Sequence, residues 1–185
     1  MFTWKSKNGI INLRGGVSMV LSAEHYEEVW DRVYDTLHFR PTVDNTVVPF
    51  KISAPYTIYG IGISNECDLE TFHRLITEAF INCTTPGELM YALDWQHDAF
   101  LFNPRNSEQM QSTYVENSKY SDGGYFACFP DYYPDGDYYF FIDEQFRFGY
   151  LSHPWREEVW IFGECLIAEF ESIYKQLGWV KKEGI

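Results

Sequence analysis

Residues 133–155 read YPDGDYYFFIDEQFRFGYLSHPW, and aromatic side chains occupy nine of these 23 positions. Pro134-Asp135-Gly136 has the composition of a tight turn. Residues 137–142 are typical of a strand whose two faces are both covered, and Asp143-Glu144 then turns the chain. Residues 145–151 alternate, which places on one face the rings of Phe146, Phe148 and Tyr150. The stretch therefore predicts a β-hairpin covered by helices.

Periodic apolar residues predict three helices around this hairpin. Ser22 is an N-cap for the first helix and Asp68 for the second, while the third covers residues 163–178 and stops at Gly178. Extended segments rich in β-branched and aromatic residues are expected at 46–50, 56–63, 88–95, 98–102 and 158–163. Adjacent strands with helices set apart favour an α+β fold: one domain with an antiparallel sheet of about six to eight strands and helices packed on one face.

The chain has 185 residues, which fits one domain. We assign residues 19–185 to it and treat residues 1–18 as a possible non-native extension. Gly15-Gly16-Val17 can be encoded by a ribosome-binding sequence a short distance before Met19, so we expect translation to start at Met19. A short strand around residues 10–13 is the alternative reading of this region.

Acidic residues outnumber basic ones by 27 to 14, and the net charge is −13. This charge disfavours nucleic acid and anionic membranes as partners over any broad surface, and it would steer a basic partner in. No stretch approaches the roughly 20 apolar residues that span a bilayer. We therefore expect a cytoplasmic protein.

The four cysteines are 16, 45 and 37 positions apart, without the close pair that binds zinc: Cys67, Cys83, Cys128 and Cys165. We expect reduced, mostly buried and inert thiols.

Two groups of polar residues could carry chemistry. Asp94, His97 and Asp98 lie within five positions at a strand turn, and Asp135, Asp137 and His153 belong to the opening stretch. A carboxylate beside an imidazole can tune a general base, and His with Asp can bind a divalent metal. If the two hairpins lie side by side, the residues that could form a joint site are Asp94, His97, Asp137 and His153.

Each of these residues also has a purely structural interpretation. Asp135 and Asp137 suit a turn, His153 before Pro154 suits a bend, and His97 can cap a hairpin. No motif with two histidines one helical turn apart is present, so we assign no metal ligand and no cofactor.

The first predicted helix has an acidic face formed by Glu24, Glu28, Asp31 and Asp35. Such a face is either solvated or a binding surface for a basic partner. Residues 103–124 are polar and without a sustained period, which makes them a candidate lid or a flexible excursion with a short helix near residues 107–114.

Three segments resemble an uncharacterised bacterial family, the domain of unknown function 2716. They are VWDRVYDTLHFRP, TPGELMYALDWQHDAFLFNP and PDGDYYFFIDEQFRFGYLSHPWREEVWIFGECLI, and the resemblance runs in order from about Ser22 to Leu177. The family pattern has Gly before HPW, where this chain has Ser152. The resemblance supports the fold and implies no activity, substrate or catalytic residue.

Two functions from different classes follow. The first is a non-catalytic cytoplasmic binding protein, immunity- or antitoxin-like, whose acidic, ring-rich surface binds a basic protein partner. The second is a metal-assisted hydrolase or other small-molecule enzyme that uses the Asp/His cluster, with a divalent metal. A homo-oligomer is compatible with either.

Overall fold

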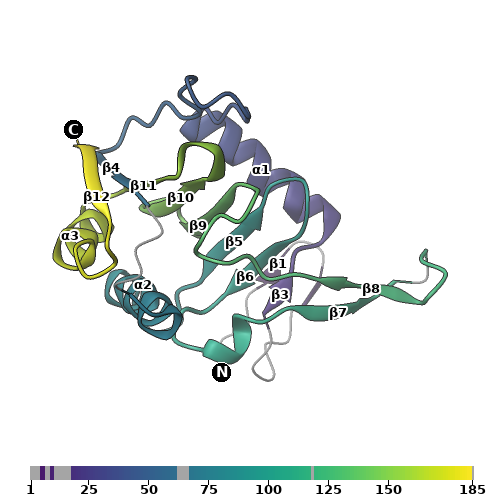
Figure 1. Cartoon of the computed structure of the whole chain (residues 1–185). Helices are drawn as coiled ribbons and strands as arrows, with labels where there is room; N and C mark the ends of the chain where they lie inside the picture. Colours follow the sequence, from purple (N-terminus) through teal and green to yellow (C-terminus); the bar gives the residue numbers. More distant parts are fainter. Residues whose placement is uncertain (1–4, 7–8, 11–17, 62–66, 118, 185) are drawn as a thin grey trace.

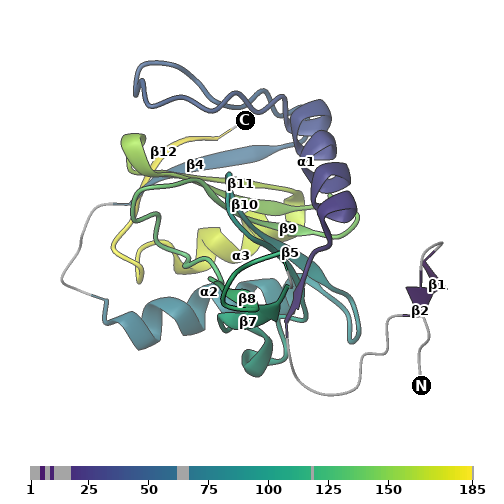
Figure 2. The ribbon, with the colours of Figure 1, turned by 90° about the vertical axis from the view of Figure 1, so that its right-hand side faces the viewer.

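An eight-stranded antiparallel sheet organises the chain, and helices cover both of its faces (Figures 1 and 2). The computed structural model describes residues 5–6, 9–10, 18–61, 67–117 and 119–184. The strand order in the sheet is β12-β4-β11-β10-β9-β5-β6-β3. The proposed extension and start site fall largely outside the described residues and stay predictions.

The eight strands are β3 (Met19–Val20), β4 (Tyr56–Gly60), β5 (Met90–Asp94), β6 (Ala99–Phe102), β9 (Tyr139–Asp143), β10 (Gly149–His153), β11 (Glu158–Phe162) and β12 (Val180–Gly184). Two separate hairpins pair β1 (Lys5–Ser6) with β2 (Gly9–Ile10), and β7 (Thr113–Glu116) with β8 (Gly124–Ala127). The helices are α1 (Ala23–Leu37), α2 (Leu69–Cys83) and α3 (Glu164–Ile173), with short 3-10 turns η1 (Ser107–Gln109) and η2 (Pro154–Arg156).

Both predicted N-caps are present. The Ser22 hydroxyl accepts a hydrogen bond from the backbone N–H of His25, and the Asp68 carboxylate accepts from that of Thr71. Each cap satisfies an N–H group that has no partner within its own helix. The two helices therefore begin where the sequence predicts.

Alternate residues of the central strands enter two separate cores. Ala92, Phe141 and Tyr150 pack with α2 and α3, whereas Leu93, Phe140 and Leu151 pack with α1. The α+β class and the antiparallel sheet of six to eight strands are confirmed. The helices, however, lie on both faces rather than on one, because the central strands are apolar on both sides and each side must be covered.

Two local predictions were wrong. Phe146 does not share a face with Phe148 and Tyr150, because it lies in the β9–β10 turn with a φ of +61° and packs on the α1 side. Residues 46–50 form no strand.

The polar segment 103–124 is not a structureless lid. It contains η1, β7 and the start of β8, and the β7–β8 hairpin extends from the body as an arm (Figure 1). No helix among the described residues has the length and apolar character needed to cross a membrane.

Candidate functional site

The strand β5 ends at Asp94, and a tight turn returns the chain into β6. Gln96 adopts a φ of +68° in this turn, and the backbone N–H of His97 donates to the Asp94 carbonyl. Asp94 follows Met90 and Ala92 at the two-residue period of a strand, so its side chain lies on the face that α2 and α3 cover. The turn then brings the His97 imidazole back over this carboxylate.

Asp137 reaches the same place from another part of the chain. It precedes β9, which pairs with β5 so that Asp94 is opposite Tyr139. The His97 Nδ1 atom lies 3.1 Å from Asp94 Oδ1 and 3.5 Å from Asp137 Oδ2. One ligand atom from each of the three residues lies within 4.8 Å of the other two. This cluster has the donor set of a divalent metal site, two carboxylates and an imidazole.

Burial sets the charge state of the cluster. Asp94 is 8% exposed, and loss of hydration raises the pKa of its carboxyl to about 6, against the opposing effect of the His97 hydrogen bond. The hydrogen bond that the His97 imidazole donates to the Asp94 carboxylate in turn raises the pKa of His97. Ionising a buried carboxyl group next to a second carboxylate costs free energy, and a bound cation would offset that cost.

His153 does not join the other three candidates. It follows Leu151 on the α1 face, where its Nε2 atom lies 3.3 Å from the Tyr138 hydroxyl. Its Nδ1 atom has no hydrogen-bond partner among the residues that the structure describes. Burial lowers the pKa of its imidazole to about 4. The four candidates therefore do not form one joint site, because Asp137 and His153 point to opposite faces of one sheet.

A pocket of about 610 Å³ adjoins the cluster. Its walls come from the start of α1, the β5–β6 turn and the β7–β8 arm, and His97 and Asp98 line it. This volume is within the range of about 300–1,000 Å³ that small-molecule sites occupy. The cluster thus lies beside a space large enough for an organic ligand.

The acidic face of α1 is exposed. Glu24, Glu28, Asp31 and Asp35 lie opposite the buried stripe of Val29, Trp30, Val33 and Leu37. Within the described part of the chain, Glu28, Asp31 and Asp35 form no salt bridge. Arg32, a basic residue of the same helix, donates to the carbonyls of Glu144 and Gln145.

The expectation of four reduced, inert thiols is wrong. Cys83 at the end of α2 forms a disulfide with Cys165 at the start of α3, 82 positions later. Cys67 is half-buried and Cys128 is exposed. The two helices lie on the same face of the sheet, and this packing brings together cysteines that no spacing rule connects.

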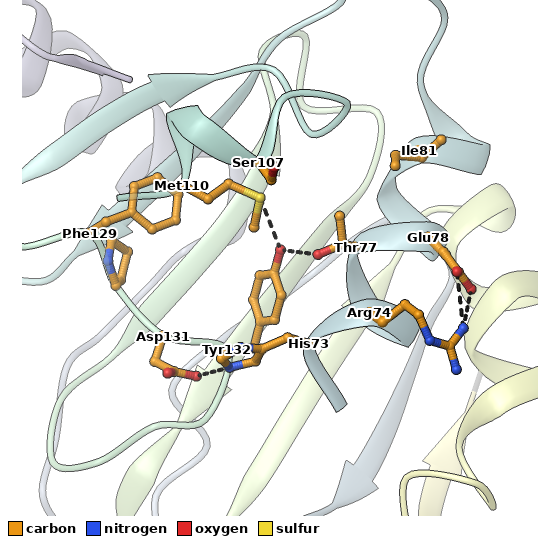
Figure 3. Close-up of a pocket in the computed structure, with 11 residues that line it drawn as sticks. His73, Arg74, Thr77, Glu78, Ile81, Ser107, Met110, Phe129, Asp131 and Tyr132 are labelled. Atoms are coloured by element: carbon orange, nitrogen blue, oxygen red, sulfur yellow. Dashed lines mark hydrogen bonds and ion pairs between the residues drawn. The ribbon is translucent and has the colours of Figure 1, made fainter. Parts of the chain in front are cut away.

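Sequence reasoning missed a second cavity, of about 530 Å³, between α2 and residues 107–132 (Figure 3). His73 Nε2 lies 3.0 Å from Asp131 Oδ1 at one end, and the buried Tyr132 hydroxyl meets Thr77 at 2.9 Å. His73 and Asp131 are 58 positions apart, and His73 lies on an ordinary helix. No local signal in the sequence marks them.

Comparisons with known proteins agree with the resemblance seen in the sequence. The family described as "Protein of unknown function (DUF2716)" matches residues 20–167, most of the chain. The uncharacterized protein YxiI of Bacillus subtilis (strain 168) is 28% identical over an alignment of 166 residues, and the match covers 82% of this chain and 91% of that protein. No solved structure matches. Neither description names an activity, a substrate or a partner. On the extent of the family match, the chain belongs to the DUF2716 family of proteins of unknown function.

Proposed function

We propose that Asp94, His97 and Asp137 bind a divalent metal ion and that the protein is a metal-dependent hydrolase or a related small-molecule enzyme. One observation carries this proposal: three side chains from two separate segments place ligand atoms within 4.8 Å of one another. Three protein ligands are also the usual number in catalytic zinc sites, where a further position stays open for water or substrate.

The adjoining pocket supports an enzymatic role over a purely structural ion. A divalent cation held by these residues would supply a Lewis acid and would activate a water molecule. His97 contributes to both the cluster and the pocket wall, so a ligand in the pocket would lie beside the cluster. Asp94 would be held ionised by the cation, against the effect of its own burial.

Isothermal titration of the EDTA-stripped protein with Zn²⁺ and with Mn²⁺ tests the metal site. We expect one ion per chain, and we expect His97→Gln and Asp137→Asn to weaken binding by more than about tenfold, since even outer-shell changes cost that much. His73→Gln is the matched control, because His73 also pairs with an aspartate but is in no three-residue cluster of ligand atoms among the described residues. Equal metal affinity in the parent chain and the three variants, or no metal binding by the parent chain, would contradict the proposal.

A second candidate function is binding of a basic protein through the acidic face of α1. The specific observation is that Glu28, Asp31 and Asp35 are exposed along one helix face without salt bridges in the described residues. Unneutralised carboxylates on a chain of net charge −13 favour fast association with a basic surface. An immunity-like role would use such an interface.

Charge reversal tests this second candidate. The triple variant Glu28→Lys, Asp31→Lys and Asp35→Lys should lose a partner that the parent chain captures from its host at low salt. The control reverses three exposed acidic residues away from α1, Glu70, Glu108 and Glu116. A partner retained by the first variant, or lost equally from both, would argue against the α1 face.

We further propose that the protein acts in the cytoplasm, which cell fractionation tests. Cytoplasmic thiols are mostly kept reduced, so the Cys83–Cys165 bond would be exceptional there. Alkylation of the same fraction before and after reduction reports the state of this pair. A chain found only outside the cytoplasm would contradict the placement.

A further inference from the structure

The pocket beside the Asp94, His97 and Asp137 cluster has one carboxylate and one imidazole in its lining. It combines Asp98, His97 and two tyrosines with apolar and neutral side chains, and none of the described residues that line it is a lysine or an arginine. The lining residues used below are Tyr26, His97, Asp98, Val115 and Tyr125. A ligand there meets one carboxylate and two aromatic rings, and His97 is the one basic group among the described residues of the lining.

The Asp98 carboxylate is held in place at the pocket wall. It accepts a hydrogen bond at 3.2 Å from the backbone N–H of Cys128, and the Tyr125 side chain hydrogen-bonds to it as well. Asp98 is half-buried, so its charge is less screened by water than a surface carboxylate. These contacts orient a fixed negative group that a cation can approach.

Tyr26 forms the α1 side of the pocket. The β8 residue Tyr125 and Asp98 at the β5–β6 turn belong to the same lining. The lining therefore combines a carboxylate with rings from two other elements.

Two aromatic rings complete the lining. Tyr26 comes from α1 and Tyr125 from β8, so the rings belong to separate elements that meet at this pocket. The face of an aromatic ring attracts a cation within about 6 Å, and the attraction strengthens when water is excluded. Rings together with carboxylates are the chemistry that proteins use to bind organic cations.

We propose that this pocket binds a small organic cation, with an alkylammonium or guanidinium group directed at Asp98 and its stem against Tyr26 and Tyr125. The inference names the substrate class of the site proposed above, and it rests on that function only in calling the ligand a substrate. A volume of about 610 Å³ accommodates such a ligand together with its stem.

The test is a nuclear magnetic resonance titration with n-butylguanidinium, in EDTA so that no metal contributes. Pentanoate, an anion of similar size, is the matched ligand. We expect the backbone amide signals of Ala99 and Val115 to shift with n-butylguanidinium and to stay unchanged with pentanoate. Equal shifts with both ligands, or none with the cation at millimolar concentrations, would overturn the inference.

Variants locate the ligand. Asp98→Asn keeps a hydrogen-bond acceptor and removes the charge, so affinity should fall by about tenfold, and Tyr125→Leu should weaken binding without changing the charge. Asp122→Asn is the control, since Asp122 is an exposed acidic residue on the arm outside the pocket lining. Unchanged affinity in both pocket variants would also overturn the inference, whereas a change confined to them supports it.

The source of the cation is distinguished by a third arm with the peptide acetyl-Gly-Arg-Gly-amide. Binding at least as tight as that of n-butylguanidinium would indicate an arginine side chain of a partner protein, and exclusion of the peptide would indicate a free small molecule. Cation binding without metal binding would support this pocket while removing the metal-dependent function. Metal binding without cation binding would leave that function standing and remove this ligand class.

Discussion

Asp94 is a carboxylate in a place that is poorly suited to a charge. Its side chain is 11% exposed, and its main polar neighbours are His97 and two further aspartates. Sites that bind ligands or metals often keep groups that lower the stability of the free protein. At the residue scale, the cluster therefore makes a prediction about stability as well as about binding.

Asp94→Asn should raise the free energy of unfolding at pH 7.5 while abolishing metal binding. The folded pKa of about 6 lies above the unfolded value of about 3.9, so the charged form is disfavoured in the fold by up to about 3 kcal/mol above pH 6. Loss of the His97 hydrogen bond offsets about 1 kcal/mol of the gain. Urea denaturation should show a net gain of about 1–2 kcal/mol, and a clear loss would contradict this account. Asp122→Asn, an exposed control, should change stability by less than about 0.5 kcal/mol.

His153 predicts loss of stability at acidic pH. Its folded pKa of about 4 lies below the unfolded value of about 6.5, so between these pH values the unfolded chain binds more protons. The contribution of His153 to the free energy of unfolding is then fully present above about pH 6.5. It is lost on acidification, with a slope of at most about 1.4 kcal/mol per pH unit.

Asp94 contributes an opposite slope between about pH 4 and 6, because its pKa is raised on folding. The His153 test is therefore made in the Asp94→Asn background, by urea denaturation from pH 4.5 to 7.5. Addition of His153→Gln, which cannot be protonated, should flatten the remaining slope. An unchanged slope in the double variant would show that His153 is not its source.

At the scale of elements, the disulfide joins two helices that cover the same face of the sheet. Cys83 ends α2 and Cys165 is the second residue of α3. A cross-link between positions 82 apart removes much freedom from the unfolded chain. It also fixes how these two helices lie relative to each other.

Reduction should therefore lower the free energy of unfolding by about 2–4 kcal/mol. Thermal melts with and without a phosphine reductant measure the effect. The double variant Cys83→Ser and Cys165→Ser should melt near the reduced parent and show no response to the reductant. If the double variant responds as strongly as the parent chain, another thiol is responsible, and the exposed Cys128 is the first to examine.

At the scale of the whole molecule, the central strand β9 lies between two cores. Phe140 packs with α1, and Phe141 packs with α2 and α3 (Figure 2 shows the helices on the two sides of the sheet). Both side chains have zero exposure. Successive side chains of a strand point to opposite faces, so a sheet with only one covered face would leave one of these two rings exposed to water.

Phe140→Ala and Phe141→Ala should each destabilise the protein by about 3–5 kcal/mol, since each leaves a cavity in a closed core. Phe126→Ala, on the arm where the ring is 62% exposed, is the control and should cost less than about 1 kcal/mol. Chemical denaturation of the three variants measures the difference. A small effect for Phe140→Ala alone would mean that α1 does not close the core on its side of the sheet.

The sequence by itself determined the local features. Helix starts at Ser22 and Asp68 follow from capping chemistry, and the β9–β10 hairpin follows from ring-rich strands around an Asp-Glu turn. The contact between Asp94 and His97 could also be predicted from the sequence, because the two residues are three positions apart in a tight turn, which keeps their side chains close.

Only the tertiary structure decided which distant residues meet. Asp137 joins Asp94 and His97 while His153 does not, since strand pairing and a two-residue alternation assign each side chain to a face. Helix packing decided the Cys83–Cys165 bond and the His73–Asp131 pair in the same way. Caps and turns depend on residues that are neighbours along the chain, so they can be read from the sequence. Contacts between distant segments depend on the register of the strands and on the face of the sheet that each side chain occupies, and these are defined only when the whole sheet has formed.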